Sequence, residues 1–218
     1  MLTRILEPEV MDTAEDARDY DAMDHGQVNR VFVDDFLRLG ECTSALDVGT
    51  GTAQIPIELC RQHARIVVEA IDASSAMIEL ARQNVVRAQL TERIALRRVD
   101  AKQLPYADGT WPATLSNSII HHIPEPRGVL AEMARVTAAH GILFVRDLLR
   151  PANDEDVHAL VKRYAADCNA HQRKLFDDSL RAALSLAEIR ALIADIGCDP
   201  ESVRQTSDRH WTWIRATA

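Results

Sequence analysis

The sequence predicts an α/β fold: a Rossmann-like, doubly wound, mostly parallel seven-stranded sheet with a C-terminal antiparallel hairpin, an N-terminal helix and a helical cap insertion. Three observations support this. From about residue 45, short β-rich runs alternate with helical runs. A glycine-rich turn follows the first β-rich run, and polar residues end the next ones. The 218 residues are enough for one domain with a sizeable core.

Five strand-like runs precede residue 150. They are Ala45–Val48, Arg65–Ile71, Ile94–Val99, Ala113–Ser118 and Gly141–Val145. Helices are predicted between the first three runs. One covers about Ala53–His63, and the next begins after a cap at Ser74 or Ser75 and ends near Leu90. Because parallel strands need such crossovers, the alternation indicates a parallel sheet.

The alternation stops after Pro151. Asn153–Leu184 is predicted to form one or two charged amphipathic helices. A capping box of Ser185 and Glu188 begins a further helix, which Gly197 ends. A short connector then joins two β-like runs and favours an antiparallel hairpin at the sheet edge. These runs are Ser202–Thr206 and Trp211–Arg215, in which Trp211 and Trp213 are expected to cover the sheet.

The composition argues against several classes of protein. The formal net charge of −8 disfavours a general nucleic-acid binder. No stretch approaches 18 uninterrupted apolar residues, so no membrane span is expected, and the acid-rich beginning is unlike a secretory signal. We therefore expect a cytoplasmic protein. Its four cysteines lack C-x-x-C spacing, so no metal is predicted, and no feature indicates a homo-oligomer.

The turn Asp47-Val48-Gly49-Thr50-Gly51-Thr52-Ala53 suits a ligand that approaches the backbone closely. A nicotinamide fingerprint would need a third glycine at position 54, which is Gln54. It would also place a pyrophosphate at the helix N-terminus, where Asp47 would be an unfavourable neighbour. The acid instead suits a cationic ligand, so an NAD-dependent oxidoreductase is the weaker alternative.

The ends of the next strands supply further polar groups on the same edge of the sheet. Asp72 lies 21 residues after Gly51, and its two oxygens could accept both hydroxyls of a ribose. Asp100 and Ala101 are placed for an adenine amine, and the run 116–118 for a ligand ammonium. Taken singly, an aspartate at a strand end is more often a cap or turn former. Four such positions in order favour a ligand site.

Four segments resemble the class I S-adenosylmethionine (SAM)-dependent methyltransferases of the small-molecule type, related to the ubiquinone/menaquinone C-methyltransferase group. They are LDVGTGTA, EAIDASSAMIELAR, RRVDAKQLPYADGTW and SNSIIHHIPEPRGVLAEMARVTAAHGILFVRDLLRP. The resemblance covers about residues 42–151 and the segment DSLRAALSLAEIRALIADIG. It implies SAM as cofactor and a small-molecule methyl acceptor. Ala53 departs from it, because glycine is commoner at that position.

The resemblance also implies which residues bind the cofactor: the turn holds the methionine part, the second strand end the ribose, and the third the adenine. The implied set is Tyr20, Asp47, Gly49, Thr50, Gly51, Asp72, Ala73, Met77, Asp100, Ala101 and Asn117. Tyr20 lies in the segment 20–25, which precedes an amphipathic helix of about Gly26–Leu39. The resemblance implies that this leading part acts as a lid with an aromatic facing the cofactor, which makes Tyr20 a candidate. Residues 1–218 are expected to form one methyltransferase domain. Its parts are lid helices (1–41), a SAM-binding core (42–150), a helical cap over the acceptor (151–184), and the last helix with the hairpin (185–218).

His121 and His122 follow the fourth strand and are the candidate catalytic residues, as general bases or by orienting a substrate oxygen. The alternative is that they fasten the loop before Pro124. For Asp147, a salt bridge with Arg146 or Arg150 is the favoured interpretation.

The acceptor is left open. The residues after the fourth strand lack the [DN]-P-P-[YF] motif of enzymes that methylate nucleic-acid bases, which argues against a nucleic-acid substrate. His25 could reach the reaction centre through the lid, but an exposed position is the favoured interpretation. Candidate pocket residues in the cap have mixed polarity and are Tyr164, Asn169, Gln172 and Phe176. A SAM-binding regulator without methyl transfer is the second hypothesis.

Overall fold

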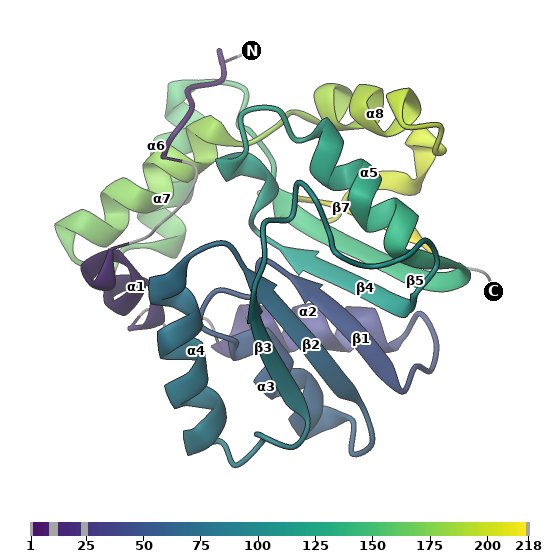
Figure 1. The fold of residues 1–218 in the computed structure, drawn as a ribbon. Helices are drawn as coiled ribbons and strands as arrows, with labels where there is room; N and C mark the ends of the chain where they lie inside the picture. Colours follow the sequence, from purple (N-terminus) through teal and green to yellow (C-terminus); the bar gives the residue numbers. More distant parts are fainter. Residues whose placement is uncertain (1, 9–12, 23–25, 217–218) are drawn as a thin grey trace. The chain divides into compact units, whose positions relative to one another are not determined.

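A computed structural model describes residues 2–8, 13–22 and 26–216, and for residues 14–16 it describes the backbone alone. The helices are α1 (Ala14–Asp21), α2 (Gly26–Leu37), α3 (Gln54–Gln62), α4 (Ser75–Arg87), α5 (Arg127–Val136), α6 (Asp154–Tyr164), α7 (Ala170–Ala182) and α8 (Leu186–Asp195). The strands are β1 (Ser44–Val48), β2 (Val67–Asp72), β3 (Ile94–Arg98), β4 (Trp111–Asn117), β5 (Thr137–Leu148), β6 (Val203–Gln205) and β7 (His210–Arg215). Short 3-10 turns cover Ile120–His122 (η1) and Pro200–Ser202 (η2). Figure 1 labels most of these elements.

The seven strands form one sheet in the order β3-β2-β1-β4-β5-β7-β6. Strand β1 pairs in parallel with β2 and β4, and β2 pairs in parallel with β3. The terminal pair, β6 and β7, is antiparallel. The predicted sheet and its C-terminal hairpin are therefore confirmed. Because Val48 pairs with Ile71, β1 and β2 end at the same level, and the glycine turn emerges beside Asp72.

The described chain groups into two compact units, each with its own core. The turn unit comprises residues 13–22, 26–117, 128–145 and 214–216, and includes the glycine turn. The cap unit comprises residues 2–8, 118–127 and 146–213. The division of residues 1–218 into four parts of one domain stays a prediction.

Aromatic and aliphatic side chains of α2, α3 and the strands fill the core of the turn unit. The rings of Phe32 and Phe144 meet edge-to-face, with centroids 4.9 Å apart, and Phe36 packs on the same ring. Two successive crossovers in one direction place α3 and α4 on the same face of the sheet, where they contact each other. These contacts bury the apolar face of each helix and hold the strand ends in place.

The core of the cap unit lies between α6, α7 and the end of β5, and α6 packs against α7 (Figure 1). Asn169 and Gln172 form a capping box at the start of α7. The predicted capping box of Ser185 and Glu188 is confirmed at the start of α8. Each box gives backbone N–H groups of a first helical turn side-chain partners, which stabilises the helix ends.

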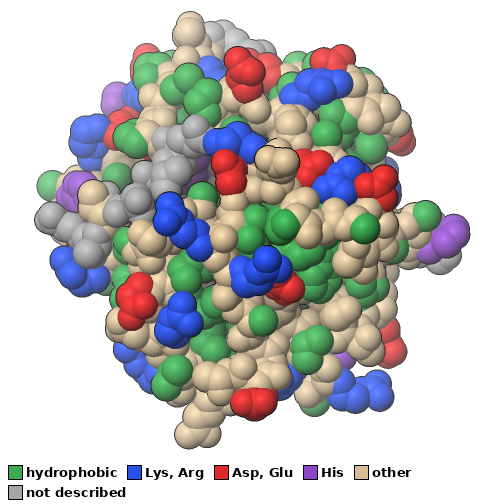
Figure 2. Space-filling model, viewed as in Figure 1, with side chains coloured by type: hydrophobic (Ala, Val, Ile, Leu, Met, Phe, Trp, Pro, Cys, Tyr) green, Lys and Arg blue, Asp and Glu red, His purple; other side chains and the backbone are tan. Residues whose placement is uncertain are grey.

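Strand β5 begins at Thr137, four residues before the predicted Gly141. The intervening residues 138–140 are more exposed than the rest of the strand, so their pattern does not indicate a strand. Gly141 is required there, because a Cβ would lie 2.7 Å from the Pro112 carbonyl oxygen. In the described part of the chain, no helix is long and apolar enough to cross a membrane. On the face that Figure 2 shows, basic and acidic side chains are interspersed.

Candidate functional site

The glycine turn is bound to the neighbouring strand through one carbonyl group. The backbone N–H groups of Gly49 and Thr50 both donate to the Ile71 oxygen, at 2.8 and 2.9 Å. Gly49 and Gly51 have φ values of 74° and 54°, in the left-handed region that glycine adopts without strain. The backbone at the end of β1 is therefore held in one conformation and open to close approach.

Asp72 links this turn to the next helix. One of its carboxylate oxygens accepts from the Gly51 N–H at 2.9 Å, and the other from the Ser74 N–H at 2.8 Å. Ser74 caps α4 by accepting from the Met77 N–H, as predicted. Each carboxylate oxygen can accept a second hydrogen bond. The carboxylate is thus positioned by backbone groups of the glycine turn and of the start of α4.

Asp47 is the most unusual group of the turn unit, because it is a buried acid that is only 2% exposed. Its Oδ2 atom and the hydroxyls of Thr50 and Thr52 have no hydrogen-bond partner among the described residues. Burial raises the pKa of Asp47 to about 7; the nearby Thr50 hydroxyl opposes this rise, and the charge of Asp72 adds to it. Unpartnered buried polar atoms are costly, so this group is a candidate for binding a ligand that supplies positive charge.

Tyr20 lies over the turn. A Cβ added at Gly51 would be 3.6 Å from Tyr20 Cε1, so the ring is close to the backbone. Burial, and then the charges of Asp72 and Asp47, raise the pKa of Tyr20 to about 12, which keeps its hydroxyl protonated. The structure therefore brings the predicted lid residue to the two acids.

A brace that the sequence did not indicate holds Tyr20 there. Oδ1 of Asp21 accepts from Asn84 Nδ2 at 2.8 Å and from Gln54 Nε2 at 3.2 Å. Asn84 also donates to the Thr52 oxygen at 3.1 Å. Gln54 thus connects α1 to the turn. In the sequence it was notable only because a nicotinamide fingerprint would have glycine at this position. The polar side chain at position 54, directly after the glycine turn, was the only feature of the sequence that could have indicated this contact.

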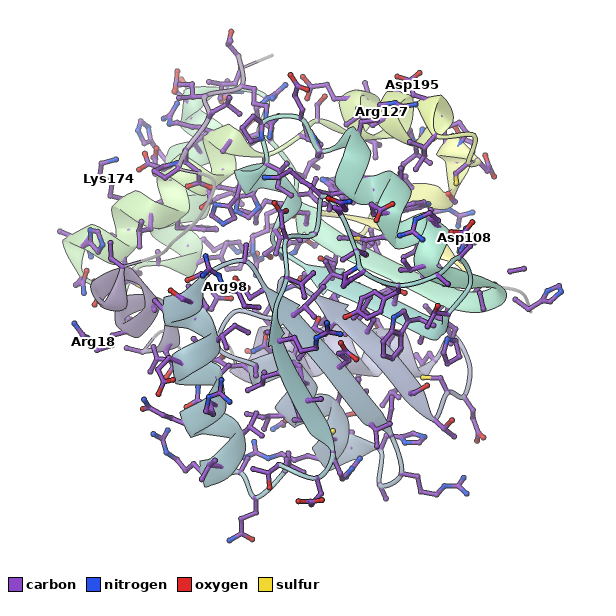
Figure 3. The ribbon with its side chains drawn as sticks, viewed as in Figure 1. Arg18, Arg98, Asp108, Arg127, Lys174 and Asp195 are labelled. Carbon is purple, nitrogen blue, oxygen red and sulfur yellow. The ribbon has the colours of Figure 1, made fainter. Side chains whose placement is uncertain are left out.

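The third strand end is more open. Asp100 is exposed; its Oδ1 accepts from the Lys102 N–H at 2.9 Å, as in a turn former, and an oxygen lies 3.6 Å from Lys102 Nζ. Arg98, labelled in Figure 3, donates to the Ala73 oxygen at 3.0 Å. The remaining predicted residues are part of the same unit. Met77 is buried, and Ala101 and Asn117 are half-buried.

The predicted catalytic pair belongs to the cap unit. His121 Nδ1 lies 2.5 Å from Asp147 Oδ1, a partner that the sequence did not suggest. Asp147 also accepts from the Ile120 and Leu148 N–H groups at 2.5 and 2.6 Å. The favoured arginine partners make other contacts: Arg146 donates to Thr212, and Arg150 to Glu188.

These contacts separate the pKa values of the two histidines. Burial acts to lower the pKa of His121, but the charge and hydrogen bond of Asp147 outweigh it, so the pKa is raised. Burial opposes ionisation of Asp147, and the contacts with His121 more than compensate, so its pKa is lowered. Burial and the neighbouring His121 lower the pKa of His122 to about 3. His122 is therefore neutral near pH 7, and it is a weak base.

An N-terminal segment closes over the pair. Glu7 Oε1 lies 3.5 Å from His121 Nε2 and 3.1 Å from His122 Nδ1. Arg4 fastens the segment by donating to the backbone oxygens of His121 and Ile123 at 3.1 and 2.9 Å. Neither residue was a candidate, because nothing local in the sequence distinguishes the segment.

Other candidates of the cap unit make structural contacts. The Tyr164 hydroxyl donates to Asp208 at 2.7 Å, and the Arg209 guanidinium lies 3.5 Å from the centre of its ring. Asn169 and Gln172 cap α7, and Phe176 packs on the core of the unit. Figure 3 shows Arg127 near Asp195 of α8, whose backbone oxygen accepts from it at 3.1 Å. His25 lies outside the described residues.

Residues 46–145 match the family model described as "Methyltransferase domain". The chain is 26% identical to a 27-O-demethylrifamycin SV methyltransferase of Amycolatopsis mediterranei, over 83% of this chain and 62% of the relative. It is 28% identical to a ubiquinone/menaquinone biosynthesis C-methyltransferase of Geotalea uraniireducens, over 53% of this chain and 49% of the relative. The chain thus spans between about half and two thirds of the length of these relatives.

Solved structures agree on the fold. A putative SAM-dependent methyltransferase from Methanococcus maripaludis superposes with a TM-score of 0.72 at 18% identity, covering 98% of this chain and 97% of that chain. The plantazolicin methyltransferase, solved with S-adenosylhomocysteine and a substrate analogue, gives a TM-score of 0.68 at 16% identity, covering 87% of this chain and 70% of the other. The family match over residues 46–145, the strand order and the glycine turn all agree with a class I SAM-dependent methyltransferase domain.

Proposed function

We propose that this protein transfers a methyl group from SAM to a small-molecule acceptor. The observation that carries the proposal is the buried acid at the glycine turn. Asp47 is 2% exposed and has an oxygen without a hydrogen-bond partner in the described part of the chain, and the charge of Asp72 acts on it. Two acids beside a close-approach turn favour a ligand that carries cationic groups, and SAM carries a sulfonium and an ammonium.

Each proposed contact uses the chemistry of one residue. Asp47 and Asn117 would hold the amino-acid part of SAM, with Gly49, Thr50 and Gly51 presenting backbone to it. Asp72 would accept from the ribose hydroxyls, since an ionised carboxylate offers two oxygens that each accept more than one hydrogen bond. Ala73, Met77, Asp100 and Ala101 would surround the adenine, and Tyr20 would cover the ligand. When bound, SAM supplies an electrophilic methyl group.

Proximity accounts for much of the rate of such a transfer, so the chain needs to hold and orient the acceptor. His121 and His122 remain the proposed residues on the acceptor side. A pKa near 3 makes His122 a hydrogen-bond acceptor for an acceptor hydroxyl rather than an efficient base at neutral pH. His121, paired with Asp147, would orient the pair.

A small-molecule acceptor is supported by the activities for which relatives are named, which include a 27-O-demethylrifamycin SV methyltransferase and a ubiquinone/menaquinone biosynthesis C-methyltransferase. The net charge of −8 supports it too, since nucleic-acid binding needs a positive surface. The absence of a proline pair after Asn117 agrees with the same class of acceptor.

Calorimetry with SAM and S-adenosylhomocysteine tests the cofactor, and transfer of labelled methyl to quinols, phenols, amines and thiols tests the reaction. We expect binding of both ligands and transfer to at least one acceptor class. Asp72→Asn should weaken binding strongly, whereas Asp167→Asn, a matched change at an exposed position, should not. No binding of either ligand would refute the proposal. Binding without transfer to any acceptor would favour a SAM-binding regulator.

A further inference from the structure

Three metal-ligating side chains of the cap unit converge on one point. Glu7 Oε1 lies 3.1 Å from His122 Nδ1 and 3.5 Å from His121 Nε2, and the three ligand atoms lie within 4.8 Å of one another. In a triangle of these dimensions, one point lies no more than about 2.4 Å from every corner, close to the 2.0–2.2 Å of zinc–nitrogen and zinc–oxygen bonds.

Hydrogen bonding within the described residues does not satisfy this cluster. Glu7 Oε1 and His122 Nδ1 are buried and have no hydrogen-bond partner there, although they lie only 3.1 Å apart. The Glu7 side chain is 9% exposed. A proton on His121 would bridge it to Glu7 and leave His122 Nδ1 unsatisfied. A divalent cation would satisfy all three atoms at once.

The surrounding contacts are those that orient metal ligands. Asp147 holds His121 Nδ1 at 2.5 Å, which turns Nε2 toward Glu7. The second oxygen of Glu7 accepts from the Ser179 hydroxyl at 3.3 Å. A ligating histidine usually donates its other N–H to a carboxylate, which fixes its tautomer and makes it a better ligand. Arg4 fixes the backbone on which His121 is carried.

We propose that Glu7, His121 and His122 bind a Zn²⁺ ion, with a water molecule completing a four-coordinate site. Two imidazoles and one carboxylate, with a fourth position for water, form a ligand set that Zn²⁺ uses in proteins. The site joins the N-terminal segment to η1. It uses none of the residues proposed to bind SAM, but it shares His121 and His122 with the proposed acceptor side. Its test measures metal binding alone, so its failure is distinguishable from failure of the proposed function.

Sequence reasoning predicted no metal, because it considered only the cysteines. The adjacent histidines are a weak signal alone, and the third ligand stands far away along the chain. The fold of the cap unit brings Glu7 to the two histidines. Glu7 belongs to the N-terminal segment, which the hydrogen bonds of Arg4 hold in place.

The test uses the full chain without a histidine tag, freed of metal with a chelator and then titrated with Zn²⁺. Competition with a chromogenic chelator gives the affinity, and Co²⁺ in place of Zn²⁺ gives visible absorption bands that report coordination geometry. We expect one Zn²⁺ per chain. Glu7→Gln and His122→Ala should each weaken binding roughly 100-fold or more, since removing a ligand costs at least as much as removing an outer contact.

His158→Ala is the matched control, because His158 is exposed on α6. This variant should bind Zn²⁺ as tightly as the wild type does. Circular dichroism establishes that each variant is folded. Glu7→Gln keeps the shape of the side chain, and the wild-type titration is informative even if a variant fails to fold. Absence of stoichiometric Zn²⁺ binding by the wild type would overturn the proposal and favour a carboxylate–imidazolium pair. Equal binding by folded Glu7→Gln and wild type would overturn it too.

Discussion

The glycine turn of the turn unit and the histidine cluster of the cap unit both hold buried ionisable groups, but they are assembled differently. The turn uses Asp47 and Asp72, which end neighbouring strands one crossover apart. The cluster joins Glu7, His121 and Asp147, which come from three distant segments. In both places a buried polar atom has no hydrogen-bond partner within the described ranges of the chain. A site formed by adjacent strands can therefore be predicted from the sequence, whereas a site formed by distant segments cannot.

The largest effect is expected from Asp72→Ala. The change removes the proposed ribose contacts and leaves the Gly51 and Ser74 N–H groups without their acceptor. Hydrogen bonds to a charged group are worth about 1.5–3 kcal/mol each, so SAM binding should weaken roughly 100-fold. His122→Ala should change SAM affinity far less, because it alters only the cap unit. Calorimetry on both variants checks this, and equal losses would mean that the strand ends are misassigned.

Asp47→Asn should separate binding from stability. The asparagine cannot attract a cation, so SAM affinity should fall roughly 10-fold to 100-fold. The ligand-free protein should become more stable by about 1 kcal/mol or more near pH 8, because a desolvated carboxylate is removed. Thermal melts without ligand measure the second effect. A lower melting temperature for folded Asp47→Asn would contradict the conclusion that the buried Asp47 carboxylate destabilises the ligand-free protein.

The raised pKa of Asp47 makes both quantities depend on pH. With a folded-state pKa of about 7, SAM affinity should fall roughly tenfold from about pH 7.5 to about pH 6, because the neutral acid loses its attraction for a cation. The contribution to stability has the opposite sign. The folded state binds the proton more tightly than the unfolded chain, so this contribution is complete below about pH 4 and is lost as the pH rises to about 7. Asp47→Asn should flatten both profiles.

Ala53→Gly should have the smallest effect. Ala53 has a φ of 62°, a conformation that costs an L-residue about 1–2 kcal/mol. Glycine would relieve this strain but would lose a buried methyl group and add freedom to the unfolded chain, each worth about 0.5–1 kcal/mol. We therefore expect the free energy of unfolding, from denaturant titration, to change by less than about 1 kcal/mol. A larger change would mean that one of these effects is misjudged.

Much of the sheet could be predicted because buried parallel strands leave short apolar runs with polar ends, and the order of Asp47, Asp72 and Asp100 follows from consecutive crossovers. The predicted cap at Ser74 and the capping box at Ser185 were equally local, and the structure confirms both. Strand β5 was shortened in the prediction because residues 138–140 are solvent-facing and carry no strand pattern.

The rest depended on long-range contacts. Nothing near Asp147 in the sequence indicates that its carboxylate forms a hydrogen bond with His121. The brace of Asp21, Gln54 and Asn84 has the same character, since its members come from three helices or their ends. Polar side chains of this kind become informative only when the fold shows what they face.

That brace has a consequence for the kinetics of ligand exchange. Asp21 holds α1, and with it Tyr20, over the turn. Entry and departure of the cofactor would then both wait for the same helix to open. If the brace also forms in the bound state, it would slow exchange in both directions and change the equilibrium constant little. The residence time of the spent cofactor would then depend on hydrogen bonds between α1, α3 and α4.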